Sequence, residues 1–188
     1  MLSIIKEKEI ETPSEIRDFI IVGNGGSGTS LLRGLLNAHS NLHVVFEHKP
    51  PRLDEFIKEA KVHEGIWGNK TPIEQFISIG LTLEQMVEIS DYFKIVHIIR
   101  RYSMYCKNRK GPYEKNWKIS QDFYNAVRER HPSRVITVSF EDLLLRTESE
   151  LTRICSFLTV NFQRKMLLGT NDTGYKRYNQ STINPKRV

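Results

Sequence analysis

Cysteine is scarce in this chain, whose 188 residues contain only Cys106 and Cys155. Two isolated thiols have neither the spacing of a zinc site nor the number needed for a disulfide framework, so neither feature organises the fold. We interpret both as packed or idle thiols of a protein in a reducing cytoplasm, the location we expect.

Long apolar runs are also missing from the sequence. No run reaches the ~18 residues that cross a membrane, so we expect no membrane span. The N-terminal segment MLSIIKEKEIE places acids where a secretory signal needs an unbroken apolar core, so we expect no such signal. The hydrophobic fraction of 39% and the length indicate about one globular domain with a sizeable core.

Acidic residues are outnumbered by basic ones, which gives a net charge of +6 and favours an anionic ligand or partner. The basic residues are scattered, and no recognition-helix or zinc-finger pattern accompanies them. We therefore predict a small phosphorylated ligand and no nucleic-acid partner.

Apolar segments of strand and helix character alternate along the chain. Residues 16–22, 42–46, 94–99 and 134–140 read as strands; residues 30–38, 53–60, 82–92, 113–130 and 147–158 read as helices. Capping boxes (TLEQ at Thr82, TESE at Thr147) open two of these helices. The alternation predicts a single α/β domain over residues 1–188, with a central parallel sheet flanked by helices. We expect a core at 16–162, an N-terminal extension at 1–15 and an irregular tail at 169–188.

Three conspicuous features directly follow predicted strands: a glycine-rich loop, Glu47 and Arg100. Ligands of parallel α/β sheets bind beyond the carboxyl ends of the strands. We therefore expect these features to surround one site, although they are far apart in the sequence.

The glycine-rich loop lies in the stretch FIIVGNGGSGTSLL. Gly23, Gly25 and Gly28 match the dinucleotide fingerprint G-x-G-x-x-G, and Glu47 could then be the acid that binds a ribose hydroxyl. Gly23 and Gly28 also match a P-loop, except that Thr29 stands where a P-loop has lysine. A turn without a ligand is the third interpretation.

Two observations favour a phosphate site over the dinucleotide site. Thr29 and Ser30 place two hydroxyls at the first helical turn, where dinucleotide-binding helices usually pack small apolar residues. A dehydrogenase also needs a further substrate region, for which 188 residues leave little room. The dinucleotide interpretation stays open as an alternative.

Four motifs in order resemble the sulfotransferases that use 3′-phosphoadenosine-5′-phosphosulfate (PAPS), particularly the tyrosylprotein type. They are GSGTSLLRGLLNAHSNL, WGNKTP, KIVHIIR and VITVSFEDLLLRTESELTRICSFL, and they extend over residues 19–162. The resemblance implies the P-loop-NTPase-like sulfotransferase fold, PAPS as cofactor, adenosine 3′,5′-bisphosphate as product, and no metal. PAPS has no γ-phosphate, so a loop without the P-loop lysine can suffice.

The resemblance also implies roles for individual residues. In the loop, the residues that bind the 5′-phosphosulfate are Gly25, Gly26, Ser27, Gly28, Thr29 and Ser30. Glu47 falls where the family has its general base, and Lys70 matches the lysine that stabilises the leaving phosphate. Arg100 and Asn108 match the 3′-phosphate positions, and Lys186 lies in a tail that resembles the family's closing loop. The alternatives are a surface glutamate, a solvated lysine and an arginine in a structural ion pair.

Some positions depart from the family pattern. Gly26 stands where the family usually has Arg or Lys against the sulfuryl group, Asn108 replaces a serine, and Phe140 replaces a tyrosine. Cations that could substitute for the one missing at Gly26 are Arg33, Arg101, Lys176, Arg177 and Lys186.

The sequence thus predicts a sulfotransferase that moves a sulfuryl group from PAPS to a hydroxyl of a small-molecule, glycan or peptide acceptor. The alternative, motivated by Gly26, is a nucleotide-binding module of the same fold with little or no catalysis. Neither the acceptor nor the oligomeric state can be read from the sequence.

Overall fold

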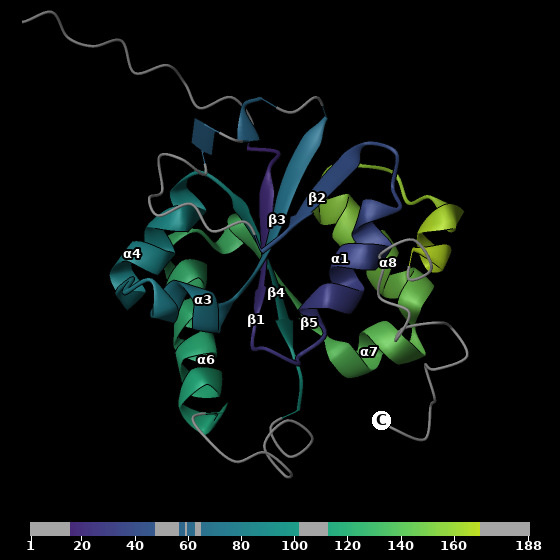
Figure 1. Ribbon diagram of the computed structural model, residues 1–188. Coiled ribbons are helices and arrows are strands. Elements are labelled where there is room, and N and C mark those ends of the chain that lie inside the picture. The colour runs from purple at the N-terminus through teal and green to yellow at the C-terminus, as the bar shows by residue number, and fades with distance from the viewer. Residues whose placement is uncertain (1–15, 48–56, 59, 63–64, 102–112, 170–188) are drawn as a thin grey trace, which may run out of the picture.

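One five-stranded parallel sheet, in the order β2-β3-β1-β4-β5, forms the centre of the molecule (Figure 1). The computed structural model describes residues 16–47, 57–58, 60–62, 65–101 and 113–169. The strands are β1 (Phe19–Gly23), β2 (Leu42–Phe46), β3 (Ile66–Pro72), β4 (Lys94–Ile99) and β5 (Val135–Ser139). The predicted single α/β domain with a parallel sheet is confirmed.

Helices cover both faces of this sheet (Figure 1). One face carries α3 (Ile73–Ser78), α4 (Leu83–Glu88) and α6 (Tyr113–Arg130); the other carries α1 (Thr29–Asn37), α7 (Phe140–Leu145) and α8 (Thr147–Phe157). Short 3₁₀ turns are η1 (Ile89–Asp91), η2 (Pro132–Arg134) and η3 (Arg164–Leu168). Of the helices in the described part of the chain, none is long and apolar enough to cross a membrane.

Strand β1 is the centre of the core, because all five of its residues are buried. Phe19 and Ile21 pack with the leucines of α1, whereas Ile20 and Val22 pack in the cluster of α3, α4 and α6. Side chains of a strand point alternately to the two faces of a sheet, and here each face has a helical layer to cover it. This explains why β1 reads as an unbroken apolar run.

Strand β3 is not among the strands predicted from the sequence, although the WGNKTP motif forms six of its seven residues. All seven residues of β3 are buried between β1 and β2. Glycine, asparagine, lysine and proline rarely form strands, so local propensity gave no signal, and pairing with both neighbours overrides it. Gly68 is required because a Cβ there would lie 2.5 Å from Cζ of Phe19.

The other boundaries agree more closely with the sequence. The bounds expected for β2, β4 and α6 are confirmed, and the Thr82–Gln85 capping box forms at the start of α4. The box expected at Thr147 is wrong, because Thr147 is already the first residue of α8 and its hydroxyl donates to Leu143 O over 2.8 Å. Helix α7 was not predicted. The helix expected at 53–60 falls mostly outside the described residues.

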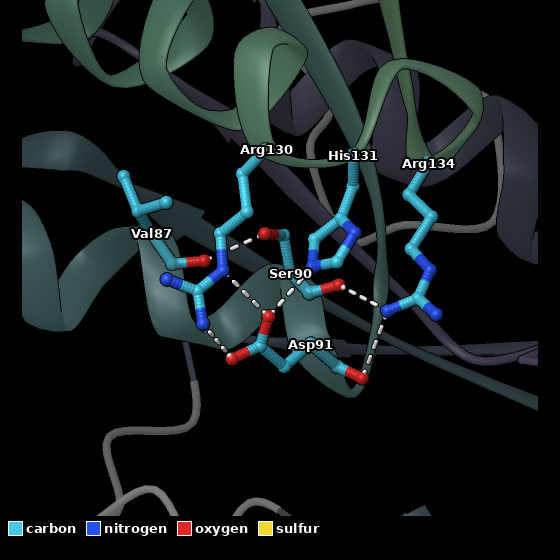
Figure 2. Close-up of polar contacts among 6 residues, drawn as sticks. All are labelled: Val87, Ser90, Asp91, Arg130, His131 and Arg134. Carbon is cyan, nitrogen blue, oxygen red and sulfur yellow. Dashed lines mark hydrogen bonds and ion pairs between the residues drawn. The ribbon is translucent and has the colours of Figure 1, made fainter. Parts of the chain in front are cut away.

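A polar cluster ties the end of α6 to the turn before β4 (Figure 2). Asp91 accepts hydrogen bonds from Arg130 Nε (2.8 Å) and His131 Nε2 (2.6 Å), and Arg134 donates to the carbonyls of Ser90 and Asp91. Partial burial would raise the pKa of Asp91, but the hydrogen bonds from Arg130 and His131 outweigh it and lower the pKa. The cluster therefore fixes the C-terminal end of α6 against the η1 turn that precedes β4.

A buried histidine makes the stability of this fold pH-dependent. His97 on β4 is fully buried, its Nε2 lies 2.9 Å from Ser120 Oγ, and burial lowers its pKa to about 4 from 6.5. The unfolded chain therefore takes up a proton between these values, so stability is present above pH 6.5 and lost as the pH falls toward 4. We expect a loss of about 2 kcal/mol between pH 7.5 and 5 from His97.

Urea unfolding of the wild-type protein and of His97→Leu at both pH values measures this contribution. The substitution should flatten the pH dependence by about that amount. An unchanged pH dependence in the variant would show that His97 takes up no extra proton on unfolding.

Candidate functional site

Parallel strand order gathers the predicted site features along one edge of the sheet. The glycine loop follows β1, Glu47 follows β2, Arg100 follows β4, and Lys70 lies near the end of β3. Because β3 and β4 flank β1, Lys70 and Arg100 lie on opposite sides of the loop. Carboxyl ends of neighbouring parallel strands form the usual ligand-binding edge of α/β sheets.

The glycine loop has a backbone that only glycine adopts easily. Gly26 and Gly28 have φ angles of 94° and 106°, and a Cβ at Gly28 would lie 2.3 Å from Cδ2 of Phe140. Gly28 thus provides both the left-handed turn into α1 and the space for the Phe140 ring. The Phe140 ring therefore packs directly against the loop at Gly28.

The guanidinium group of Arg100 packs against the same aromatic ring. Its Cζ lies 4.6 Å from the centroid of Phe140, and its Nη1 lies 3.4 Å from the carbonyl oxygen of Gly26. The guanidinium therefore borders the loop, as expected if both contact one ligand. Its buried Nε has no hydrogen-bond partner among the described residues.

Lys70 is almost completely buried, with 2% of its side chain exposed, and forms an ion pair with Glu47. Its Nζ also lies 4.3 Å from the ring centroid of Phe46. Burial lowers the pKa of Lys70 below its ordinary value, and the Glu47 carboxylate opposes that shift. The solvated-lysine interpretation is therefore wrong.

Glu47 is held in a defined orientation while 27% of its side chain stays exposed. Its backbone has a φ of 50°, unusual for a residue with a side chain, and its N–H donates to Lys70 O over 3.0 Å. Lys70 Nζ donates to Oε1, and Gln75 Nε2 donates to Oε2. Such uncommon backbone conformations persist where the surroundings fix them, often at functional sites.

Arg33 lies beside the ion pair. Its Cζ is 5.4 Å from the Phe46 ring, its Nε donates to Val44 O over 3.0 Å, and its charge contributes to lowering the pKa of Lys70. The charge of Arg101 acts on Asp142 instead, at the other side of the sheet edge. Several cations were considered as substitutes for the cation that is missing at Gly26. Among those that the structure describes, Arg33 is the one that lies next to Lys70.

Glu74 contacts the glycine loop, and the sequence alone did not single it out. Both its carboxylate oxygens accept from the N–H of Gly25, at 3.0 and 2.9 Å, and Asn116 Nδ2 lies 3.5 Å from Oε1. Gly25, expected to donate to a ligand, thus donates to Glu74. Glu74 and Gln75 are the second and third residues after the WGNKTP motif, and recognising a helix start there would have drawn attention to both.

The buried polar atoms at this edge fit an anionic ligand. Asn24 Nδ2, Ser27 Oγ and Thr71 Oγ1 are buried and have no hydrogen-bond partner within the described part of the chain. A donor left unpaired in a protein interior is costly, and a phosphate oxygen is an acceptor that can satisfy such a donor. Backbone N–H groups of a glycine turn that opens a helix attract such an anion.

Two predicted residues, Asn108 and Lys186, lie outside the described residues. Of the remaining loop residues, Thr29 is buried and Ser30 is half-buried, both in the first turn of α1. Among the described residues, no group of three or more His, Cys, Asp or Glu side chains could hold a metal ion.

Substitution of Gly28 tests the role of the loop in the fold. We expect Gly28→Ala to lose about 2–4 kcal/mol of stability, because a positive φ is unfavourable for alanine and its Cβ would collide with Phe140. Gly80→Ala is the matched control: its φ is also positive, at 80°, but a Cβ would meet nothing within 4 Å. Equal losses in urea unfolding of the two variants would contradict the packing of Phe140 under the loop.

Comparison with known proteins supports the fold. No protein-family model matches the chain, and no curated protein matches it in sequence. The sulfotransferase domain of the Synechococcus PCC 7002 olefin synthase is similar, with a TM-score of 0.66, 18% identity, and 96% of this chain and 90% of that chain covered. The sulfotransferase domain from the curacin biosynthetic pathway has a TM-score of 0.62, 16% identity, and coverages of 93% and 90%.

The mouse sulfotransferase SULT7A1 complexed with PAP is a third similar structure, with a TM-score of 0.55 and 15% identity. The similarity covers 93% of this chain and 76% of that one. At these identities the likeness concerns the fold. This chain therefore has the single-domain α/β fold of these sulfotransferases.

Proposed function

We propose that this protein is a PAPS-dependent sulfotransferase that transfers a sulfuryl group to an acceptor hydroxyl. The observation that carries the proposal is the position of Lys70 and Arg100 on either side of the glycine loop, with Glu47 paired to Lys70. One of the similar structures is a sulfotransferase complexed with PAP, which supports an adenosine bisphosphate at this edge.

The residues divide into three groups around the proposed ligand. The loop residues 26–30, including the hydroxyls of Thr29 and Ser30, bind the 5′-phosphosulfate, and Gly25 joins them only once its N–H is released from Glu74. Arg100 and Asn108 bind the 3′-phosphate. Lys186, whose segment resembles the family's closing loop, is a further residue proposed to bind the cofactor. The unpaired Nε of Arg100 and Oγ of Ser27 support this assignment, because each would gain an oxygen partner.

The chemical roles of Glu47 and Lys70 follow from where a proton leaves and where negative charge develops during the transfer. When bound, PAPS supplies the sulfuryl group and leaves as adenosine 3′,5′-bisphosphate, its bridging S–O bond breaking as the acceptor oxygen binds sulfur. Glu47 takes the proton of the acceptor hydroxyl, because its carboxylate is oriented and partly exposed. Lys70 places a buried positive charge beside the leaving phosphate, where a low dielectric strengthens the interaction. Arg33 compensates for the cation absent at Gly26.

The finer assignment is to the tyrosylprotein type of sulfotransferase. Its support is the combination of a carboxylate after β2 with the lysine of WGNKTP, which form an ion pair here. The acceptor is a small molecule, a glycan or a peptide. Location in the cytoplasm, expected from the two isolated cysteines, stays a prediction.

A nucleotide-binding module with little catalysis is the second candidate. Two observations favour it: Gly26 lacks the usual cation, and the Glu74 carboxylate lies against the loop at Gly25, where it repels anions. Both candidates require adenosine bisphosphate binding, so only turnover separates them.

Ligand-dependent thermal unfolding tests the binding site. We expect adenosine 3′,5′-bisphosphate at 100 times its Kd to stabilise the protein by about 2.7 kcal/mol, or roughly 5–10 °C in Tm. ATP with magnesium and NAD should give much smaller shifts. Arg100→Gln should remove most of the shift given by the bisphosphate. Stabilisation by NAD alone would favour the dinucleotide interpretation and overturn the proposal.

Substitution of Glu47 tests the proposed base. Turnover with a labelled sulfate donor should fall at least about 100-fold in Glu47→Ala, because the proposed base is removed, while bisphosphate affinity is retained. Glu47→Gln keeps the side-chain volume and should show the same loss. Glu84→Ala, on the exposed side of α4, is the matched control and should retain activity. Near-normal transfer by both Glu47 variants would remove Glu47 from the mechanism.

A further inference from the structure

The side-chain amide of Gln75 contacts the proposed base but has no part in the reaction as described so far. We infer that Gln75 is a positioning residue, whose amide fixes the carboxylate of Glu47 in the orientation needed to receive the acceptor proton. This inference rests on the proposed role of Glu47.

The two carboxylate oxygens of Glu47 accept hydrogen bonds from two different donors. Lys70 Nζ donates to Oε1, whereas Gln75 Nε2 donates to Oε2. With both oxygens bound, the carboxylate cannot rotate about its last bond without losing a hydrogen bond. Each carboxylate oxygen has a second lone pair, so the held group can still accept a hydrogen bond from an acceptor hydroxyl.

Gln75 also suits this task because its amide is neutral. Lys70 already brings one positive charge to Glu47. An amide donor orients the carboxylate without adding a second charge. A base needs both a fixed position and enough proton affinity to act.

The surroundings of Gln75 argue against a purely structural role. Its buried Oε1 has no hydrogen-bond partner among the described residues. A buried acceptor without a partner costs stability, and an apolar side chain such as methionine would avoid this cost. Packing alone therefore does not account for an amide at this position, whereas the bond to Glu47 does.

Chain connectivity makes the arrangement rigid. Strand β3 passes through Pro72 directly into α3, so Lys70 and Gln75 are separated by four residues across one strand–helix junction. Glu74, in the same turn, holds Gly25 of the loop. One short segment thus contacts both the loop and the proposed base, which is also the ion-pair partner of Lys70.

The test replaces Gln75 with methionine, which has a similar length and no amide. We expect kcat to fall about 10-fold or more, because the base is no longer aimed, with the Kd for adenosine 3′,5′-bisphosphate changed less than twofold. Gln75→Asn, which keeps the amide but shortens its reach, should show the same pattern if Gln75→Met folds poorly.

Two further measurements distinguish positioning from general damage. In a Glu47→Ala background, Gln75→Met should cause no further loss of rate, since its effect passes through Glu47. Gln163→Met is the matched control: Gln163 also uses both amide atoms, with Ser40, but lies beyond the amino ends of the strands, so kcat should not change.

The possible outcomes separate this inference from the proposed function. If the wild-type protein transfers no sulfuryl group, the proposed function fails and the role of Gln75 fails with it. If the wild-type protein is active, an unchanged kcat in both Gln75 variants overturns the inference alone. A loss of equal size in the Glu47→Ala background also overturns it, because Gln75 would then act independently of the base.

Discussion

A buried positive charge constrains the site edge of this protein. Lys70 lies in a strand that is covered on both sides, where an unpaired ammonium group would be very costly. Its partner, Glu47, comes from the end of the neighbouring strand, and the register that pairs Phe46 with Lys70 brings the two together. The backbone of Glu47 is left-handed at this junction, and the ring of Phe46 lies against the Lys70 ammonium group.

The same sheet explains how an anion could be held by a loop without a P-loop lysine. Strand β1 ends in backbone donors and hydroxyls, and its two neighbours bring the charges, Lys70 from β3 and Arg100 from β4. Positive charge therefore flanks the loop instead of residing in it. Glu74 works against this arrangement, because its carboxylate lies on the loop at Gly25.

The sequence predicted the architecture well, because the apolar runs of β1, β2 and β4 and the length of α6 are strong local signals. It failed at β3, at the start of α8 and at α7. In WGNKTP the strand is stabilised by pairing on both edges, and in TESE the first threonine is already helical and bonded back to Leu143. Both outcomes depend on contacts with distant residues, which no local pattern contains.

For the candidate site, resemblance of the motifs singled out the glycine loop, Glu47, Lys70 and Arg100, and their roles stay predictions. Only the tertiary structure decided how they meet: the Lys70–Glu47 ion pair, the packing of Arg100 on Phe140, and the contacts of Glu74 and Gln75. The physical reason is that hydrogen bonds and ion pairs are short-ranged and directional. Strand order and register set which side chains come within that range, and both are properties of the folded chain.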